Sequence, residues 1–171
     1  LRAISTVGVF TLLSRVFGFF RDVLIANFLG TSSVADAFFV AFKFPNFFRR
    51  LFAEGAFNAA FVPLFGERLA TKGKASARVF AAEAAAVLVS ALMLFTFVAV
   101  LLMPWLMYAI APGFADQPEK FRLTIELTQI TFPYLMFMAL IALLGGMLNT
   151  MQRFAATAAA PILLNIVLIS A

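Results

Sequence analysis

Five cationic side chains fall within the first two apolar stretches of the chain: Arg15, Arg21, Lys43, Arg49 and Arg50. A cation at the centre of a bilayer costs about 2.5–3.5 kcal/mol on insertion scales, so each charge needs a partner, water or a ligand. The same stretches hold three carboxylates, Asp22, Asp36 and Glu54. Two positive charges therefore remain in surplus, and a cationic, water-filled cavity in a membrane protein suits an anionic ligand.

Helical spacing gathers the charges of the second stretch on one face. Asp36, Lys43 and Arg50 are seven residues apart, which returns each side chain to within about 20° of the previous one. Glu54 follows Arg50 at i+4 and extends this polar stripe. Arg49 projects about 100° away from it. We expect the stripe to line the cavity.

The first stretch presents its two guanidinium groups in different directions. Arg15 and Asp22 are seven residues apart and share a face, whereas Arg21 projects about 120° away from Arg15. A ligand bound here would be held from two angles.

Several residues predict bends in these helices. Pro45 removes one backbone hydrogen bond and favours a kink, and Asn46 directly after it is placed to meet freed carbonyls or the ligand. Gly18 and Gly55 are further positions for bending or close packing.

Purely structural roles are also open to several of these residues. Arg50 and Glu54 could snorkel to the membrane interface, and Asp22 and Asp36 could form ion pairs that only hold helices together. The pair Gly145 and Gly146 is more typical of helix packing than of a ligand site.

The composition requires membrane helices to position these charges. Of the 171 residues, 64% are hydrophobic and 12% charged, with a mean hydropathy of +1.02, far from the roughly 25% charged residues of soluble domains. We predict an all-α, polytopic transmembrane helix bundle. The chain has no cysteine and no histidine, which removes thiolate and imidazole chemistry and His/Cys metal sites. An enzyme, a metal site and nucleic-acid binding are not expected.

Polar breaks divide the chain into five predicted spans: Leu1–Leu29, Val34–Phe65, Val79–Ala111, Arg122–Thr150 and Phe154–Ala171, the last cut short. With the N-terminus inside, two basic residues, Lys120 and Arg122, lie outside, and six lie on the cytoplasmic side, as the positive-inside rule prefers. These six are Arg2, Arg68, Lys72, Lys74, Arg78 and Arg153. Because the chain starts at Leu and ends within an apolar run, we expect a piece of a longer protein.

Six segments, in the right order over the whole chain, resemble the bacterial MurJ (MviN) lipid II flippases of the multidrug/oligosaccharidyl-lipid/polysaccharide exporter superfamily. They are SRVFGFFRD (Ser14–Asp22), DAFFVAFKFPNFFRRLFAEGAFNAAFVP (Asp36–Pro63), APGF (Ala111–Phe114), TFPYL (Thr131–Leu135), LLGGMLNTMQRF (Leu143–Phe154) and APILLNI (Ala160–Ile166). The first two signatures are long and specific.

The resemblance implies a two-lobe transporter of the cytoplasmic (inner) membrane that flips lipid II, an undecaprenyl-pyrophosphate carrying the peptidoglycan precursor, by alternating access. This chain would be the first part of the N-terminal lobe, without the C-terminal lobe that completes the cavity. The family's cavity arginines map onto Arg15, Arg21 and Arg49. Apart from lipid II, the expected partners are membrane lipids. A coupling cation or the membrane potential would drive the full-length protein, and no cofactor is expected in this part.

Alternatives of two classes stay open, a related transporter and a non-transporting scaffold. A related lipid-linked oligosaccharide flippase would share the pyrophosphate chemistry, whereas a drug antiporter of the same superfamily should have an acidic cavity. A non-transporting membrane scaffold, of a different class, would use the same charges only as structural ion pairs.

Overall fold

The computed structural model describes residues 2–30, 32–49 and 57–170, and side chains from residue 7 onward except at Leu29 and Arg49. Helices and their connections make up all of this described part, which contains no strand. The predicted all-α class is therefore confirmed. The described chain divides into two compact units.

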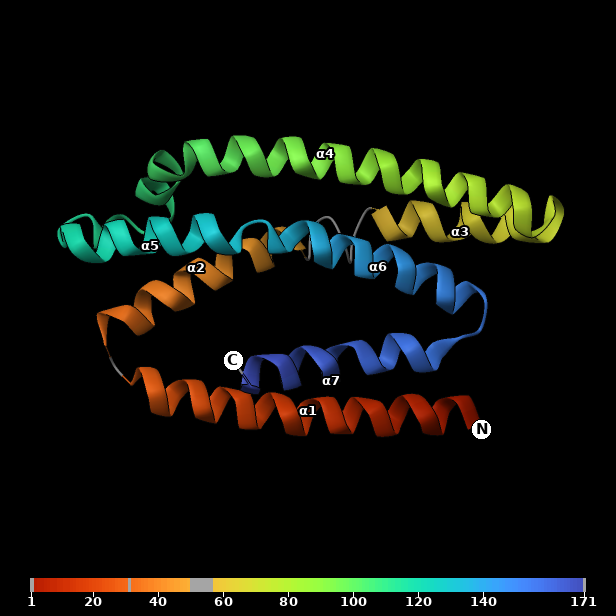
Figure 1. The fold of residues 1–171 in the computed structure, drawn as a ribbon, viewed down its shortest axis with the longest axis horizontal. Helices are drawn as coiled ribbons and strands as arrows, with labels where there is room; N and C mark the ends of the chain where they lie inside the picture. Colours follow the sequence, from red (N-terminus) through yellow and green to blue (C-terminus); the bar gives the residue numbers. More distant parts are fainter. Residues whose placement is uncertain (1, 31, 50–56, 171) are drawn as a thin grey trace. The chain divides into compact units, whose positions relative to one another are not determined.

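The first unit pairs the beginning of the chain with its end. It contains α1 (Arg2–Leu29), α7 (Phe154–Ser170) and the last turn of α6 (Tyr134–Thr150). Helices α1 and α7 run side by side in Figure 1. The turn before α7 holds Gln152 at a φ of 58°, and the N–H of Arg153 bonds to the carbonyl of Leu148 at 2.8 Å. This geometry matches a Schellman end of α6.

The second unit contains α2 (Ser33–Arg49), α3 (Phe57–Thr71), α4 (Gly73–Ile110), the short 3-10 helix η2 (Pro112–Phe114), α5 (Pro118–Thr131) and most of α6. Helix α5 packs against both α2 and α4, and α3 packs against α4 (Figure 1). The fully buried side chains of the second unit include Phe132, Met103, Met107, Leu135 and Leu143. Phenylalanine rings meet at Phe132, with Phe44 at 5.6 Å and Phe95 at 5.8 Å between centroids.

The first connection forms as predicted. Gly30 ends α1 at a φ of 56°, a conformation that glycine adopts without strain. The hydroxyl of Ser32 accepts a hydrogen bond from the N–H of Ala35 at 3.2 Å. Ser32 is therefore the N-cap of α2.

The second predicted connection, residues 66–78, is wrong as a loop, because α3 continues to Thr71 and α4 starts at Gly73. The segment GERLATKGKASAR is polar but rich in helix formers, so a change in polarity does not end the helices. The interruption lies at Lys72 and at Gly73, which has a φ of 77°.

The fourth predicted span is divided. Helix α5 ends at Thr131, and α6 begins at Tyr134. Pro133 explains the break, because it has no N–H to continue the helical hydrogen bonds and its ring crowds the carbonyl of Gln129, four residues earlier. Phe132 itself keeps helical backbone angles, with a φ of −60° and a ψ of −38°. The second predicted span appears as α2 and α3, and residues 50–56 between them lie outside the described part.

Two segments of the described chain are long and apolar enough to cross a membrane, Gly73–Ile110 and Pro118–Thr150. Helix α7 is also apolar, with 17 residues. The other predicted spans stay predictions.

Candidate anion-binding groove

One face of α1 turns toward α7 and carries Ser14, Gly18 and Arg21. These residues are four and three positions apart, which places them above one another on one side of a helix. Gly18 has no side chain, and a Cβ built on it would lie 3.6 Å from Nδ2 of Asn165. Asn165 of α7 is therefore able to lie close to the α1 backbone.

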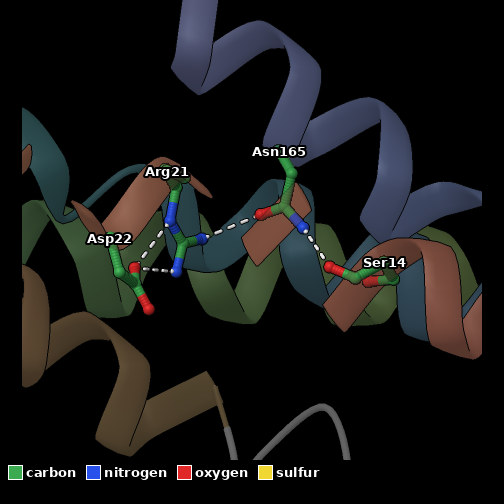
Figure 2. Close-up of polar contacts among 4 residues, drawn as sticks. All are labelled: Ser14, Arg21, Asp22 and Asn165. Atoms are coloured by element: carbon green, nitrogen blue, oxygen red, sulfur yellow. Dashed lines mark hydrogen bonds and ion pairs between the residues drawn. The ribbon is translucent and has the colours of Figure 1, made fainter. Parts of the chain in front are cut away.

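Asn165 uses both ends of its amide to join the two helices. Its Nδ2 donates to the carbonyl oxygen of Ser14 at 3.0 Å, and its Oδ1 accepts from Nη1 of Arg21 at 3.0 Å. Figure 2 shows this chain of contacts. Asn165 is 5% exposed, and a buried amide left without hydrogen bonds would cost free energy.

Arg21 is held from a second side by its neighbour. Its Nε and Nη2 donate to Oδ1 of Asp22 at 3.0 and 2.6 Å (Figure 2). The Arg21 side chain is 26% exposed and that of Asp22 is 67% exposed. Arg21 is thus a fixed, partly neutralised guanidinium. Asp22 forms an ion pair, but with its neighbour in the same helix and not between helices as the structural alternative expected.

Arg15 has a different environment in the same unit. It is exposed and lines a groove of about 490 Å³ together with Thr11, Ser14, Asn149 and Thr157. The groove also has apolar walls: Val7, Phe154, Ala158 and Pro161. Within the described part of the chain Arg15 makes no ion pair, so its charge is available to a ligand.

The polar wall of the groove is itself ordered by hydrogen bonds. The Thr157 hydroxyl lies 2.9 Å from Oδ1 of Asn149 and 2.9 Å from the Phe154 carbonyl oxygen. The groove therefore combines one unpaired guanidinium, hydroxyl groups and an apolar wall. This arrangement suits an anionic group attached to an apolar body. No group of Asp, Glu, His or Cys in the described residues could hold a metal ion.

The second unit shows how Asp36 is used. Its Oδ2 lies 2.6 Å from Nζ of Lys120 on α5, and the same Nζ lies 4.0 Å from the centre of the Phe114 ring. The Lys120 side chain is only 11% exposed. Asp36 thus joins α2 to α5 through a structural ion pair, one of the two roles that the sequence allows for it.

The other predicted residues of α2 differ in exposure. Lys43 is exposed, Asn46 is half-buried and Pro45 is buried. Helix α2 continues through Pro45. Arg49 ends this helix, with its side chain outside the described part, and Arg50, Glu54 and Gly55 lie outside it altogether. The predicted stripe and the cavity shared by the first two spans therefore stay predictions.

Sequence reasoning missed Asn165 as a functional residue. In the sequence analysis Asn165 is quoted only as part of the segment APILLNI. The signal that could have indicated it is an isolated amide in an apolar helix, which usually marks a hydrogen bond to another helix. The sequence places Lys120 in an external loop but does not indicate its partner Asp36. The packing role expected of Gly146 is confirmed, because a Cβ there would lie 2.9 Å from Cγ2 of Val62 on α3.

A family model described as lipid II flippase MurJ matches residues 25–171. A probable lipid II flippase MurJ from Rhizobium tropici is 56% identical over 167 residues, which are 97% of this chain and 31% of that relative. A lipid II flippase MurJ from Burkholderia cenocepacia is 42% identical over 170 residues, which are 99% of this chain and 33% of that relative. The chain thus spans about a third of the length of these curated relatives.

Proposed function

Because the chain belongs to the lipid II flippase MurJ family, we propose that the protein containing it moves lipid II across the cytoplasmic (inner) membrane. The headgroup would cross through a cationic cavity by alternating access while the tail stays in lipid. This is transport, so no bond is made or broken. The missing C-terminal lobe would supply the other wall of the cavity.

The observation that carries this proposal is the contrast between two arginines. Arg15 lines the groove without an ion pair among the described residues, whereas Arg21 is fixed by Asn165 and Asp22. A pyrophosphate carries about two negative charges and planar acceptor groups that a guanidinium matches better than an ammonium does. Arg15 would bind the headgroup directly, and Arg21 would join it with its remaining donors. Arg49 stays a candidate because the family resemblance maps a cavity arginine onto it.

Driving force and orientation complete the proposal. The membrane potential supplies about 2.3 kcal/mol per charge per 100 mV, and a coupling cation bound elsewhere in the full-length protein is the alternative source.

With the N-terminus in the cytoplasm, the α3–α4 turn with Lys72 and Lys74 would lie inside. Reporter fusions at residue 72 should give cytoplasmic signals, and fusions at residue 116 should give periplasmic ones. The reverse pattern would contradict this orientation.

Complementation in cells depleted of their lipid II flippase tests the function. The full-length parent protein would carry Arg15→Ala, Arg21→Ala or Arg49→Ala, with membrane protein levels measured alongside. We expect Arg15→Ala to abolish growth at a normal protein level. Arg21→Ala should lower the protein level as well, because it leaves Oδ1 of the buried Asn165 without its donor.

A matched control is Arg153→Ala, which removes an exposed arginine from the α6–α7 turn of the same unit. It should support normal growth. Full growth of Arg15→Ala would contradict direct headgroup binding. Loss of growth only in proportion to protein level, for all three variants, would favour the scaffold with structural ion pairs.

A further inference from the structure

Three prolines, Pro45, Pro63 and Pro104, lie inside described helices of the second unit, and each leaves a backbone carbonyl without its usual donor. Pro45 and Pro104 are the two whose carbonyls a neighbouring helix reaches. Pro45 in α2 cannot donate to the carbonyl of Ala41, and Pro104 in α4 cannot donate to that of Val100. Where water is absent, an unsatisfied carbonyl costs several kcal/mol. Each of these two carbonyls therefore needs a donor from outside its own helix.

Helix α5 supplies a side-chain donor to each of them. The hydroxyl of Thr131 lies 3.0 Å from the Ala41 carbonyl oxygen, and Nε2 of Gln129 lies 3.0 Å from the Val100 carbonyl oxygen. Residues two positions apart project about 200° apart around a helix. Thr131 and Gln129 consequently reach helices on opposite sides of α5, at the carbonyl four residues before each proline.

Ordinary local bonding does not account for these contacts. Threonine hydroxyls on α5 do bond back to their own helix: Thr124 to the Lys120 carbonyl at 2.7 Å and Thr128 to the Thr124 carbonyl at 2.6 Å. Thr131 lies 3.2 Å from the Thr128 carbonyl but closer to Ala41. A hydroxyl has one proton, and the geometry favours donating it across to α2.

We propose that Thr131 and Gln129 are positioning residues, which hold α2 and α4 at their internal prolines and so set the course of both helices. Thr131 thereby orients the part of α2 that carries Lys43 and Asn46. Ala41 is 0% exposed and Pro45 is fully buried, so water cannot replace the Thr131 hydroxyl. This inference goes beyond the proposed transport function and does not depend on the identity of the substrate.

Coupling between each donor and its proline tests the proposal in the purified full-length parent protein. Thr131→Val removes the donor at constant shape and should lower the Tm by roughly 1–4 °C, whereas Thr131→Ser keeps the hydroxyl and should not. In a Pro45→Ala background the restored N–H at position 45 satisfies the Ala41 carbonyl. Thr131→Val should then have little effect.

The second pair gives an independent copy of the experiment. Gln129→Leu should lower the Tm, and Pro104→Ala should suppress that loss. Thr128→Val is the matched control, since it removes a buried hydroxyl from the same helix that serves no proline carbonyl. Its effect should be unchanged by Pro45→Ala. If Pro45→Ala does not fold, the Gln129 and Pro104 pair decides the question alone.

The position of α2 can be measured directly, and this measurement separates the positioning role of Thr131 from general stabilisation. A single cysteine at position 43 (Lys43→Cys), in a parent without other cysteines, would be labelled with a membrane-impermeant maleimide. Thr131→Val should change the labelling rate, and Thr131→Ser should restore it. The proposal would be overturned if the Tm losses of the donor and proline variants were additive for both pairs, Thr131 with Pro45 and Gln129 with Pro104. An unchanged labelling rate in Thr131→Val would overturn it as well.

Discussion

Asn165 joins the two main helices of the first unit, because its buried amide on α7 bonds to Arg21 and to the backbone of Ser14 on α1. Hydrogen bonds to charged groups contribute about 1.5–3 kcal/mol. Asn165→Leu keeps the volume and removes both bonds. It should lower the free energy of unfolding by about that amount.

Thermal unfolding of the purified parent protein would measure this loss. Asn149→Ala is a suitable comparison, since it removes an amide from the same unit that is exposed, and it should cost much less. Equal stability of Asn165→Leu and the parent would contradict the role assigned to this amide.

Residue types and spacing indicated Arg21 and Asp22 as functional, but they did not indicate the partner on α7. Helical periodicity relates residues within one helix, whereas Arg21 and Asn165 are 144 positions apart in the chain. The pairing of Asp36 with Lys120 was missed for the same reason, since these residues are 84 positions apart. Long-range pairs of this kind depend on helix packing, which no local pattern specifies.

At the scale of elements, helix α6 packs closely on α3 through Gly146. A Cβ at this position would lie 2.9 Å from Cγ2 of Val62 and 3.3 Å from Oδ1 of Asn58. Gly146→Ala should therefore lower the free energy of unfolding by about 1–3 kcal/mol, as overpacking does. Thermal unfolding would measure it.

Val62→Ala removes the atom that the new methyl group meets, so the double variant should lose less stability than the two single losses combined. Gly8→Ala, where a Cβ would meet nothing within 4 Å, should cost nothing because alanine favours helices. A Gly146→Ala protein as stable as the parent would show that α3 and α6 pack less closely than this contact requires.

The turn between α6 and α7 carries backbone strain at Gln152, which has a φ of 58°. A left-handed conformation costs a side-chain-bearing residue about 1–2 kcal/mol, and glycine avoids that cost. Gln152→Gly should raise the Tm, whereas Met151→Gly, one position earlier, should not. A lower Tm for Gln152→Gly would mean that the glutamine side chain contributes more than the backbone strain costs.

Helix boundaries were predictable where a residue caps a helix or adopts a non-helical backbone conformation. They were unpredictable where only the polarity of the sequence changes. The capping Ser32 and the left-handed Gly30 mark a connection found as expected. The polar segment at residues 66–78 is helical except around Lys72, because Glu, Arg, Ala and Lys all favour helix. Pro45 and Pro104 are both interior to helices, and the carbonyls they leave free find donors on α5.

For the whole molecule, composition and motifs carried the family assignment. The surplus of cations predicted an anionic ligand, and the match to lipid II flippases agrees with that charge. A drug antiporter would need an acidic cavity, so the charge argues against it. The cavity predicted for the first two spans and the source of energy stay predictions for the full-length protein, because this chain spans about a third of its curated relatives.

Headgroup binding is tested most directly by the affinity of the purified full-length parent protein for lipid II, measured by titration with Arg15→Ala and with Arg153→Ala. Loss of one charge-assisted contact predicts a Kd raised about 10-fold or more for Arg15→Ala. Arg153→Ala should keep the parent's Kd. An unchanged Kd for Arg15→Ala would contradict the claim that the unpaired arginine of the groove binds the anionic headgroup.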